Sequence, residues 1–270
     1  MGQKVNQSIF RLGLNNSEWN YKYIEKNAEE SSLFLYKNKE ILNYIDTILK
    51  LHDIVTHSCK IEYTKTSINL FIKFFDLNSD TKKRSEKLST KGLSSYLITK
   101  LMGTTLNLYL KNKQVNIKLK HLNQSFENKT RTNIVNKVYF KKFKKLLKNK
   151  LYKNLIKIMF MSVYEKNSSK LIADVISIYV NKHKKKHYYL MSILKNYFEI
   201  LIYSKFSKIK GIKIKISGRI NGAPRAKTKT IQIGSIPLQS FSSLISYHNS
   251  VSYTSNGSFG VKVWICQKVL

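Results

Sequence analysis

The most regular alternation of apolar and polar residues lies near the C-terminus, between residues 211 and 266. Isoleucines alternate with polar residues over 212–217, and a period of two is typical of a strand with one buried face. A second alternation, over 261–265, follows a turn at Asn256-Gly257. The pattern predicts a sheet in which one face forms a core and the other carries cations.

Two stretches with apolar residues at helical spacing precede this sheet. The first follows Ser168 and Ser169, either of which can cap a helix. The predicted apolar stripes are Leu171, Ile172, Val175, Ile176 and Tyr179 in the first helix, and Leu190, Ile193, Leu194, Tyr197 and Leu201 in the second. We expect both helices to cover the sheet in a C-terminal α+β domain over 167–270, with two helices on four mainly antiparallel strands.

A second, smaller α+β domain is predicted over 36–123. Its expected elements, in chain order, are a helix over 38–51, strands over 60–65 and 67–75, a polar basic loop over 76–91, a helix after Gly92 and a strand over 114–121. The predicted apolar stripes are Ile41, Tyr44, Ile45, Ile48 and Leu51 in the first helix, and Leu93, Tyr96, Leu97, Leu101 and Leu108 in the second. Helices on one face of a sheet are the expected arrangement.

Two segments lie outside these domains. Residues 1–35 are predicted as an N-terminal arm whose opening is too irregular for a helix, with Lys4 and Arg11 placed to contact phosphate. Residues 124–166 mix lysine with large apolar residues and are predicted as a basic insertion. Three interpretations of the insertion compete: a basic helix on RNA, a helix on a membrane surface, or a solvated insertion.

Composition adds a strong charge bias to this picture. The chain has 270 residues, with 49 Lys plus Arg against 15 Asp plus Glu, for a net charge of +34. Such a chain repels itself, so we expect an anionic partner, with RNA or DNA ahead of an acidic membrane. The run Lys184, Lys185 and Lys186 shares a domain with Arg219, Arg225 and Lys227, and these cations are candidate contacts to a nucleic-acid backbone.

Candidate catalytic and metal-binding residues are few. His183 and His187 have the spacing of a metal pair on a helix, but three lysines lie between them and a further ligand is missing. No carboxylate is paired with a histidine in a recognisable motif, so we expect neither a metal, nor a cofactor, nor enzymatic turnover. Two cysteines imply no disulfide framework, and no apolar run is long enough to predict stable membrane insertion.

The sequence resembles the family of small-subunit ribosomal protein three, the KH-domain protein of the ribosomal head. The resemblance rests on MGQKVNQ…FRLGL at the N-terminus and on GIKIKISGRINGAPRAK, SIPLQSF and FGVKVWI near the C-terminus. SSKLIADVIS and QVNIKL are similar to a helix and a strand of the same family. The resemblance covers both ends and most of the chain between them, apart from the insertion.

This resemblance implies a divergent type II KH domain followed by the family's C-terminal α+β domain. KH domains clamp nucleotides with a GXXG loop. The matching place here holds Ser89-Thr90-Lys91-Gly92, so Lys91 and Gly92 are candidate RNA contacts although the first glycine is replaced. The family's Arg-Arg-x-x-Lys cluster, linked to mRNA unwinding, aligns with His187, Tyr188 and Met191, and the preceding lysine run is the candidate substitute.

The resemblance also implies a function. We expect a structural constituent of the small-subunit head that binds rRNA, adjoins other head proteins and lines the channel through which mRNA enters. Residues with A/T-rich codons and the lack of a recognisable presequence favour a mitochondrially encoded member in the matrix, ahead of a plastid or bacterial one. The alternatives are an organellar RNA-processing enzyme and a basic protein of a membrane surface.

Overall fold

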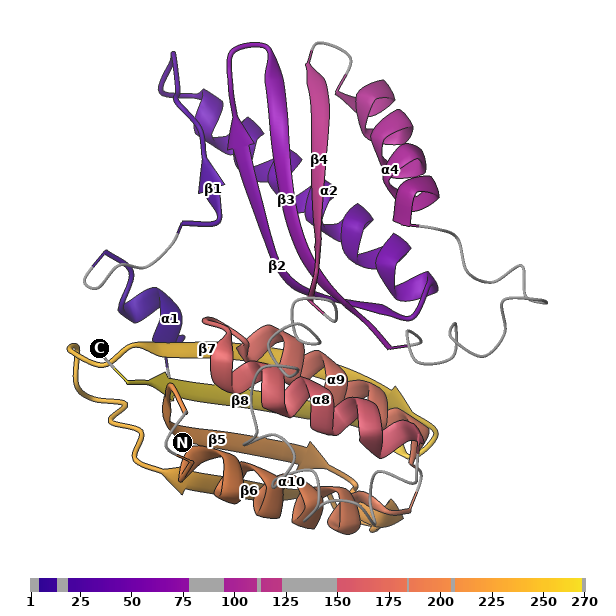
Figure 1. Cartoon of the computed structure of the whole chain (residues 1–270), viewed down its shortest axis with the longest axis vertical. Helices are drawn as coiled ribbons and strands as arrows, with labels where there is room; N and C mark the ends of the chain where they lie inside the picture. The colour runs from indigo at the N-terminus through magenta and orange to yellow at the C-terminus, as the bar shows by residue number, and fades with distance from the viewer. Residues whose placement is uncertain are drawn as a thin grey trace. The chain divides into compact units, whose positions relative to one another are not determined.

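The chain divides into two units in a computed structural model, one over Glu18–Ile134 and one that combines Met1–Ser17 with Val135–Leu270 (Figure 1). The structure describes residues 5–13, 19–77, 95–110, 113–122, 150–183, 185–204 and 207–268. The predictions for Lys4, Lys91, Gly92, Lys184, nearly all of the loop over 76–91 and the insertion before residue 150 fall outside these residues. Each unit is an α+β structure, as the sequence predicted.

In its described residues, the first unit is a four-stranded mixed sheet packed against two helices. The sheet order is β1 (Tyr21–Lys22), β2 (Ile54–Tyr63), β3 (Ser67–Asp76) and β4 (Gln114–His121). β2 and β3 are antiparallel, whereas β1 lies parallel to β2 and β4 parallel to β3. Helices α2 (Glu30–Leu51) and α4 (Ser95–Tyr109) share one hydrophobic core with the sheet (Figure 1).

The buried face of α4 is not the one that the sequence predicted. Leu97, Leu101 and Leu108 are exposed, while the core holds Ile98, Met102 and Leu106. Both sets have helical spacing, and the set that begins at Ile98 contains the side chains that meet the sheet.

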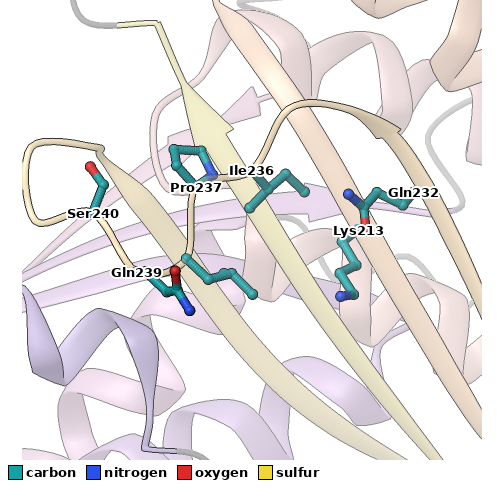
Figure 2. Close-up of a pocket in the computed structure, with 7 residues that line it drawn as sticks. Lys213, Gln232, Ile236, Pro237, Gln239 and Ser240 are labelled. Atoms are coloured by element: carbon teal, nitrogen blue, oxygen red, sulfur yellow. The ribbon is translucent and has the colours of Figure 1, made fainter.

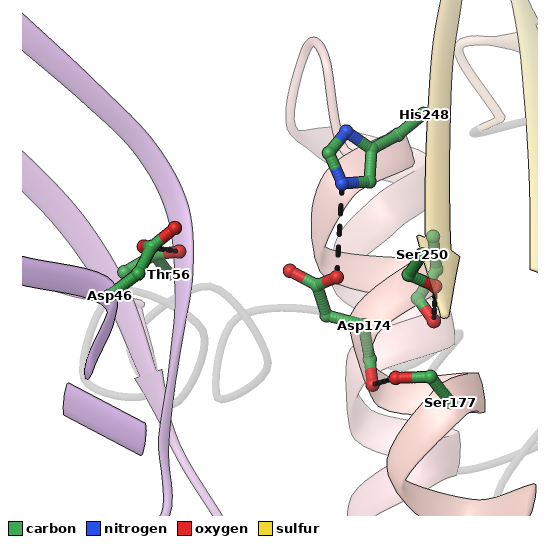
Figure 3. A network of polar contacts seen from close by, with 7 residues as sticks. Asp46, Thr56, Asp174, Ser177, His248 and Ser250 are labelled. Atoms are coloured by element: carbon green, nitrogen blue, oxygen red, sulfur yellow. Dashed lines mark hydrogen bonds and ion pairs between the residues drawn. The ribbon is translucent and has the colours of Figure 1, made fainter. Parts of the chain in front are cut away.

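The predicted boundaries around β2 also need correction. Helix α2 begins at Glu30, eight residues before the predicted start at 38, and its last apolar residue, Leu51, is 82% exposed. Leu49 is buried in its place. The strand predicted over 60–65 starts at Ile54 and ends at Tyr63. A hydrogen bond from Thr56 Oγ1 to Asp46 Oδ1, at 2.9 Å, ties this early part of β2 to α2 (Figure 3).

The second unit contains the sheet predicted from the alternating C-terminal segments. Its strand order is β6 (Lys227–Gly234), β5 (Ile209–Gly218), β8 (Gly257–Gln267) and β7 (Ile245–Thr254), and every neighbouring pair is antiparallel. The isoleucines at 212, 214 and 216 and the apolar residues at 261, 263 and 265 are all buried. The prediction of a sheet with one core face is therefore confirmed.

The helices of this unit form two further layers over the sheet. α9 (Ser169–Lys182) packs on β7 and β8, and α10 (His187–Ile202) packs on β5 and β6 (Figure 1). Every residue of the two predicted apolar stripes is buried. α8 (Lys150–Tyr164) packs on both helices, and its Leu155, Ile158 and Met159 are buried. The described part of the predicted insertion thus contributes a helix to the core.

Polar side chains fasten α9 at its start and to the sheet. Ser250 Oγ on β7 donates a hydrogen bond to the carbonyl oxygen of Ala173 at 2.8 Å, and His248 Nε2 lies 3.8 Å from Asp174 Oδ1 (Figure 3). Ser168 precedes α9, but its side chain makes no capping bond and instead donates to the carbonyl oxygen of Ser162. The predicted serine cap is therefore not made by Ser168.

Candidate nucleic-acid interface

A pair of reciprocal hydrogen bonds joins two segments that the sequence analysis singled out separately. Asn221 Oδ1 accepts from the backbone N–H of His187 at 2.8 Å, and the backbone N–H of Asn221 donates to His187 Nδ1 at 2.9 Å. His187 is the first residue of α10 and is 2% exposed. Asn221 lies in the short helix η1 (Ile220–Gly222) with φ 55°, a left-handed conformation that asparagine tolerates well. The first residue of α10 is therefore bonded to the loop after β5.

Five of the predicted contact residues flank this pair at one end of the second unit. All five are exposed, and together we call them the basic end: Lys185, Lys186, Arg219, Arg225 and Lys227. Arg219 Nε donates to the carbonyl oxygen of Ala223 at 2.9 Å, which fixes its guanidinium beside the turn. Exposed cations on a loop anchored to a rigid helix are suited to contact a phosphate backbone.

Two residues extend the basic end beyond the sequence prediction. Lys229, two residues after Lys227 on β6, is exposed, and its Nζ lies 5.8 Å from the centre of the Tyr188 ring on α10. A cation over an aromatic face is a favourable contact. The signal was present in the sequence, because residues two apart on a strand point to the same face.

The histidines at this end act as structural groups. Because Nδ1 of His187 accepts a hydrogen bond, its proton lies on Nε2, which faces the carbonyl oxygen of Val180 at 3.4 Å. Burial lowers the pKa of His183, and the charges of Lys186 and Lys182 lower it further. Among the described residues, no group of three or more His, Cys, Asp or Glu is placed to hold a metal ion.

The strands of the second sheet carry basic residues and no acidic ones. Residues 200–270 contain eleven Lys plus Arg and no Asp or Glu, so acidic side chains of this segment do not offset the basic end. Clustered charge of one sign attracts a polyanion over a distance set by the ionic strength.

Arg11 differs from its expected role. Its side chain is 6% exposed: Nη2 donates to the carbonyl oxygens of Leu238 at 2.7 Å and Ser240 at 2.8 Å, and Nη1 donates to the Gln7 side chain. The prediction that Arg11 contacts phosphate is corrected, because its guanidinium is buried and donates hydrogen bonds to groups inside the second unit. It fastens the arm, whose short helix α1 (Gln7–Phe10) packs on β7 although no helix was expected there.

We expect Arg11→Ala to lower the free energy of unfolding by about 2 kcal/mol, because charge-assisted bonds to the loop over 237–240 are lost and its carbonyl oxygens lose their donor. Urea denaturation measures the effect. Gln7→Ala is the control, since it removes one acceptor and leaves the loop contacts, and it is expected to cost less than half as much. Equal stability of Arg11→Ala and the parent would show that the arm is not fastened there.

We expect Asn221→Ala to destabilise the chain by about 2 kcal/mol, through loss of the bond to the first turn of α10 and through strain at a positive φ. Asn221→Gly relieves the strain and isolates the bond. Thermal unfolding is measured for both Asn221 variants, for His187→Ala and for the chain that combines His187→Ala with Asn221→Gly, which completes a double-mutant cycle. Each bond joins one side chain to the backbone of the other residue, so we expect each substitution to lower stability by itself. Unchanged stability of both Asn221→Gly and His187→Ala would contradict a stabilising role for the reciprocal bonds.

The fold and the site together define a strongly basic α+β domain whose exposed cations gather beside the start of one helix. Residues 194–265 match the family described as ribosomal protein S3, C-terminal domain. This part of the chain matches a ribosomal protein S3 C-terminal domain, and the match confirms the resemblance indicated by the C-terminal motifs.

Named relatives agree with this assignment. Small ribosomal subunit protein uS3c of Cyanidium caldarium is 52% identical over 59 residues, which are 22% of this chain and 28% of that protein. Small ribosomal subunit protein uS3 of Karelsulcia muelleri is 53% identical over 55 residues, 20% of this chain and 24% of that protein. Small ribosomal subunit protein uS3m of Marchantia polymorpha is 36% identical over 129 residues, 47% of this chain and 28% of that protein. The chain therefore spans less than a third of the length of these relatives.

Proposed function

We propose that the chain is a structural, RNA-binding component of a small ribosomal subunit and that its basic end contacts rRNA. The observation that carries the proposal is that Arg219, Arg225 and Lys227 lie within the matched residues 194–265. The bonds between His187 and Asn221 hold the start of α10, which follows Lys185 and Lys186, against the loop after Arg219. The chemistry is neutralisation of phosphates by exposed lysine and arginine, without turnover.

The proposal extends to the first unit, as a divergent type II KH domain. Its support is the element order α2, β2, β3, α4 and β4, with the last strand parallel to β3. The proposed partners are small-subunit rRNA, the proteins beside it in the head and mRNA in the channel through which it enters. Lys185 and Lys186, exposed just before α10, are the candidate mRNA contacts.

The proposed location is the mitochondrial ribosome, with a plastid or bacterial ribosome as the alternative. A mitochondrial relative stands beside plastid and bacterial ones, and the codon bias expected from the composition favours an organellar gene. In the part of the chain that the structure describes, no helix has the length and apolar character needed to span a membrane.

Sedimentation of mitochondrial extract through a sucrose gradient tests the proposal. A tagged chain is expected to travel with small-subunit rRNA and to leave that fraction after nuclease treatment. Recovery with membranes after nuclease treatment would favour the membrane-surface alternative. Metal-dependent cleavage of RNA by the purified chain would favour the processing enzyme. Either result, without association with small-subunit rRNA, would contradict the proposal.

A further inference from the structure

The second sheet has a face that α9 and α10 do not cover. Because Ile214 and Val263 point to the helices, Lys213, Lys215 and Trp264 point to the opposite side. Strand register places these residues in two rows across the four strands. The first row is Gln232, Lys213, Trp264 and Tyr247, and the second is Thr230, Lys215, Lys262 and Asn249.

The N-terminal arm closes one end of this face. Ile245 and Cys266 pair with each other on the same side as Trp264, yet both are buried, and α1 packs on β7. Burial raises the pKa of the Cys266 thiol, while the charges of Lys210 and Arg11 lower it. The two rows begin next to this closed end, and their side chains are exposed or half-buried.

The rows combine aromatic surfaces with cations. The Tyr247 and Trp264 rings have centroids 5.2 Å apart and planes inclined by 37°, and Lys213 Nζ lies 5.8 Å from the centre of the Trp264 ring. Lys215 and Lys262 are direct partners in the next row. Two lysines placed opposite each other repel, so the arrangement favours a bound anion between or above them.

A recess of about 460 Å³ adjoins the first row (Figure 2). Its walls are Ile236, Pro237 and Leu238, and its polar groups come from Lys213, Gln232, Gln239 and Ser240. Arg11 holds this loop in place through the carbonyl oxygens of Leu238 and Ser240. Apolar walls with amide groups at the rim suit an unstacked base, since an amide can both donate to and accept from a base edge.

We infer that this face binds a single-stranded RNA segment, with a base stacked on Trp264, a neighbouring base in the recess and the phosphates on Lys213, Lys215 and Lys262. The occupant is RNA because the two rows contain three lysines and two aromatic rings without a carboxylate. The inference deepens the proposed function and rests on it, and it assigns a second contact surface besides the basic end.

The test uses the full chain carrying Trp19→Phe, which leaves Trp264 as the only tryptophan. A short unstructured oligouridine is expected to quench the Trp264 fluorescence, and an RNA duplex of the same length is expected to leave it nearly unchanged. Stacking of a base against the indole is the physical cause.

Affinity is measured separately, by anisotropy of labelled oligouridine with chains that retain Trp19. Trp264→Ala is expected to weaken binding about 10-fold, and Trp264→Phe to restore most of the loss. Tyr203→Ala, at an exposed aromatic residue after α10, is the matched control with unchanged affinity. Lys262→Ala is a second test variant, chosen because Lys262 is exposed and its removal should leave the fold intact. It is expected to reduce the slope of log K against log salt by about 1, whereas the control Lys195→Ala on α10 is expected to leave the slope unchanged.

Fluorescence that oligouridine leaves unchanged, together with unchanged affinity of Trp264→Ala, would overturn the inference and assign the face to a protein partner. That result would leave the proposed function standing if the chain still sedimented with small-subunit rRNA. Failure to sediment, by contrast, would remove the proposed function whatever oligouridine does.

Discussion

Removal of the five cations of the basic end is expected to weaken binding to small-subunit rRNA by about 10³-fold at ~0.1 M salt. The variant combines alanine substitutions at Lys185, Lys186, Arg219, Arg225 and Lys227. With fewer phosphate contacts, binding releases fewer counterions from the RNA. The slope of log K against log salt should therefore become shallower by about 4. Filter binding over a series of salt concentrations measures both quantities.

A second variant with the same loss of charge separates local contact from overall attraction. It carries alanine at exposed lysines outside the basic end, namely Lys37, Lys39, Lys50, Lys100 and Lys195. We expect it to retain most of the salt slope, because long-range attraction changes while the contacts of the basic end persist. Equal losses in the two variants would show that net charge, and not this arrangement, determines binding.

Gly234→Ala is expected to destabilise the second unit by about 4 kcal/mol. Gly234 has φ 73° at the end of β6, and a Cβ there would meet the backbone of β5, with Gly211 Cα at 2.9 Å. Since the obstructing atoms are main chain, no side-chain rotation relieves the contact. The displaced segment leads into the loop whose carbonyl oxygens bind Arg11, so the arm should loosen as well.

Gly257→Ala is the matched control for this effect. Gly257 also has a positive φ, of 114°, but a Cβ there meets nothing within 4 Å. The variant therefore carries conformational strain without overlap, and we expect a loss of about 1–2 kcal/mol. Chemical denaturation of both variants checks the difference, and a similar loss in each would contradict the close approach of β5 and β6.

The sheet of the second unit was predictable because the alternation of apolar residues in its strands is compatible with only one buried face. β5 and β8 are central strands with one face against helices, so buried residues such as Ile212 and Val263 recur at every second position and the register follows. Helix α4 was predicted wrongly because it is apolar on more than one side. Leu101 and Met102 both belong to plausible stripes, and only packing against the sheet decides between them.

The site was predictable as a set of cations but not as an arrangement. Arg11 and Leu238 are 227 residues apart, and no local pattern indicates that a guanidinium will be buried against distant carbonyl oxygens. The bonds between His187 and Asn221 span 34 residues, so the spacing of His183 and His187 drew attention to a metal pair instead. Burial of a polar side chain and hydrogen bonds between distant residues cannot be predicted from the spacing of residues in the sequence.

Directed hydroxyl-radical probing of the assembled small subunit tests the central claim most directly. Cys59 and Cys266 are both buried, so a cysteine introduced by Ala226→Cys, between Arg225 and Lys227, is the accessible site for an iron chelate. We predict cleavage of small-subunit rRNA at discrete positions near the label, absent from the parent chain treated in the same way. An intact rRNA in subunits that contain the labelled chain would contradict the claim that the basic end contacts rRNA.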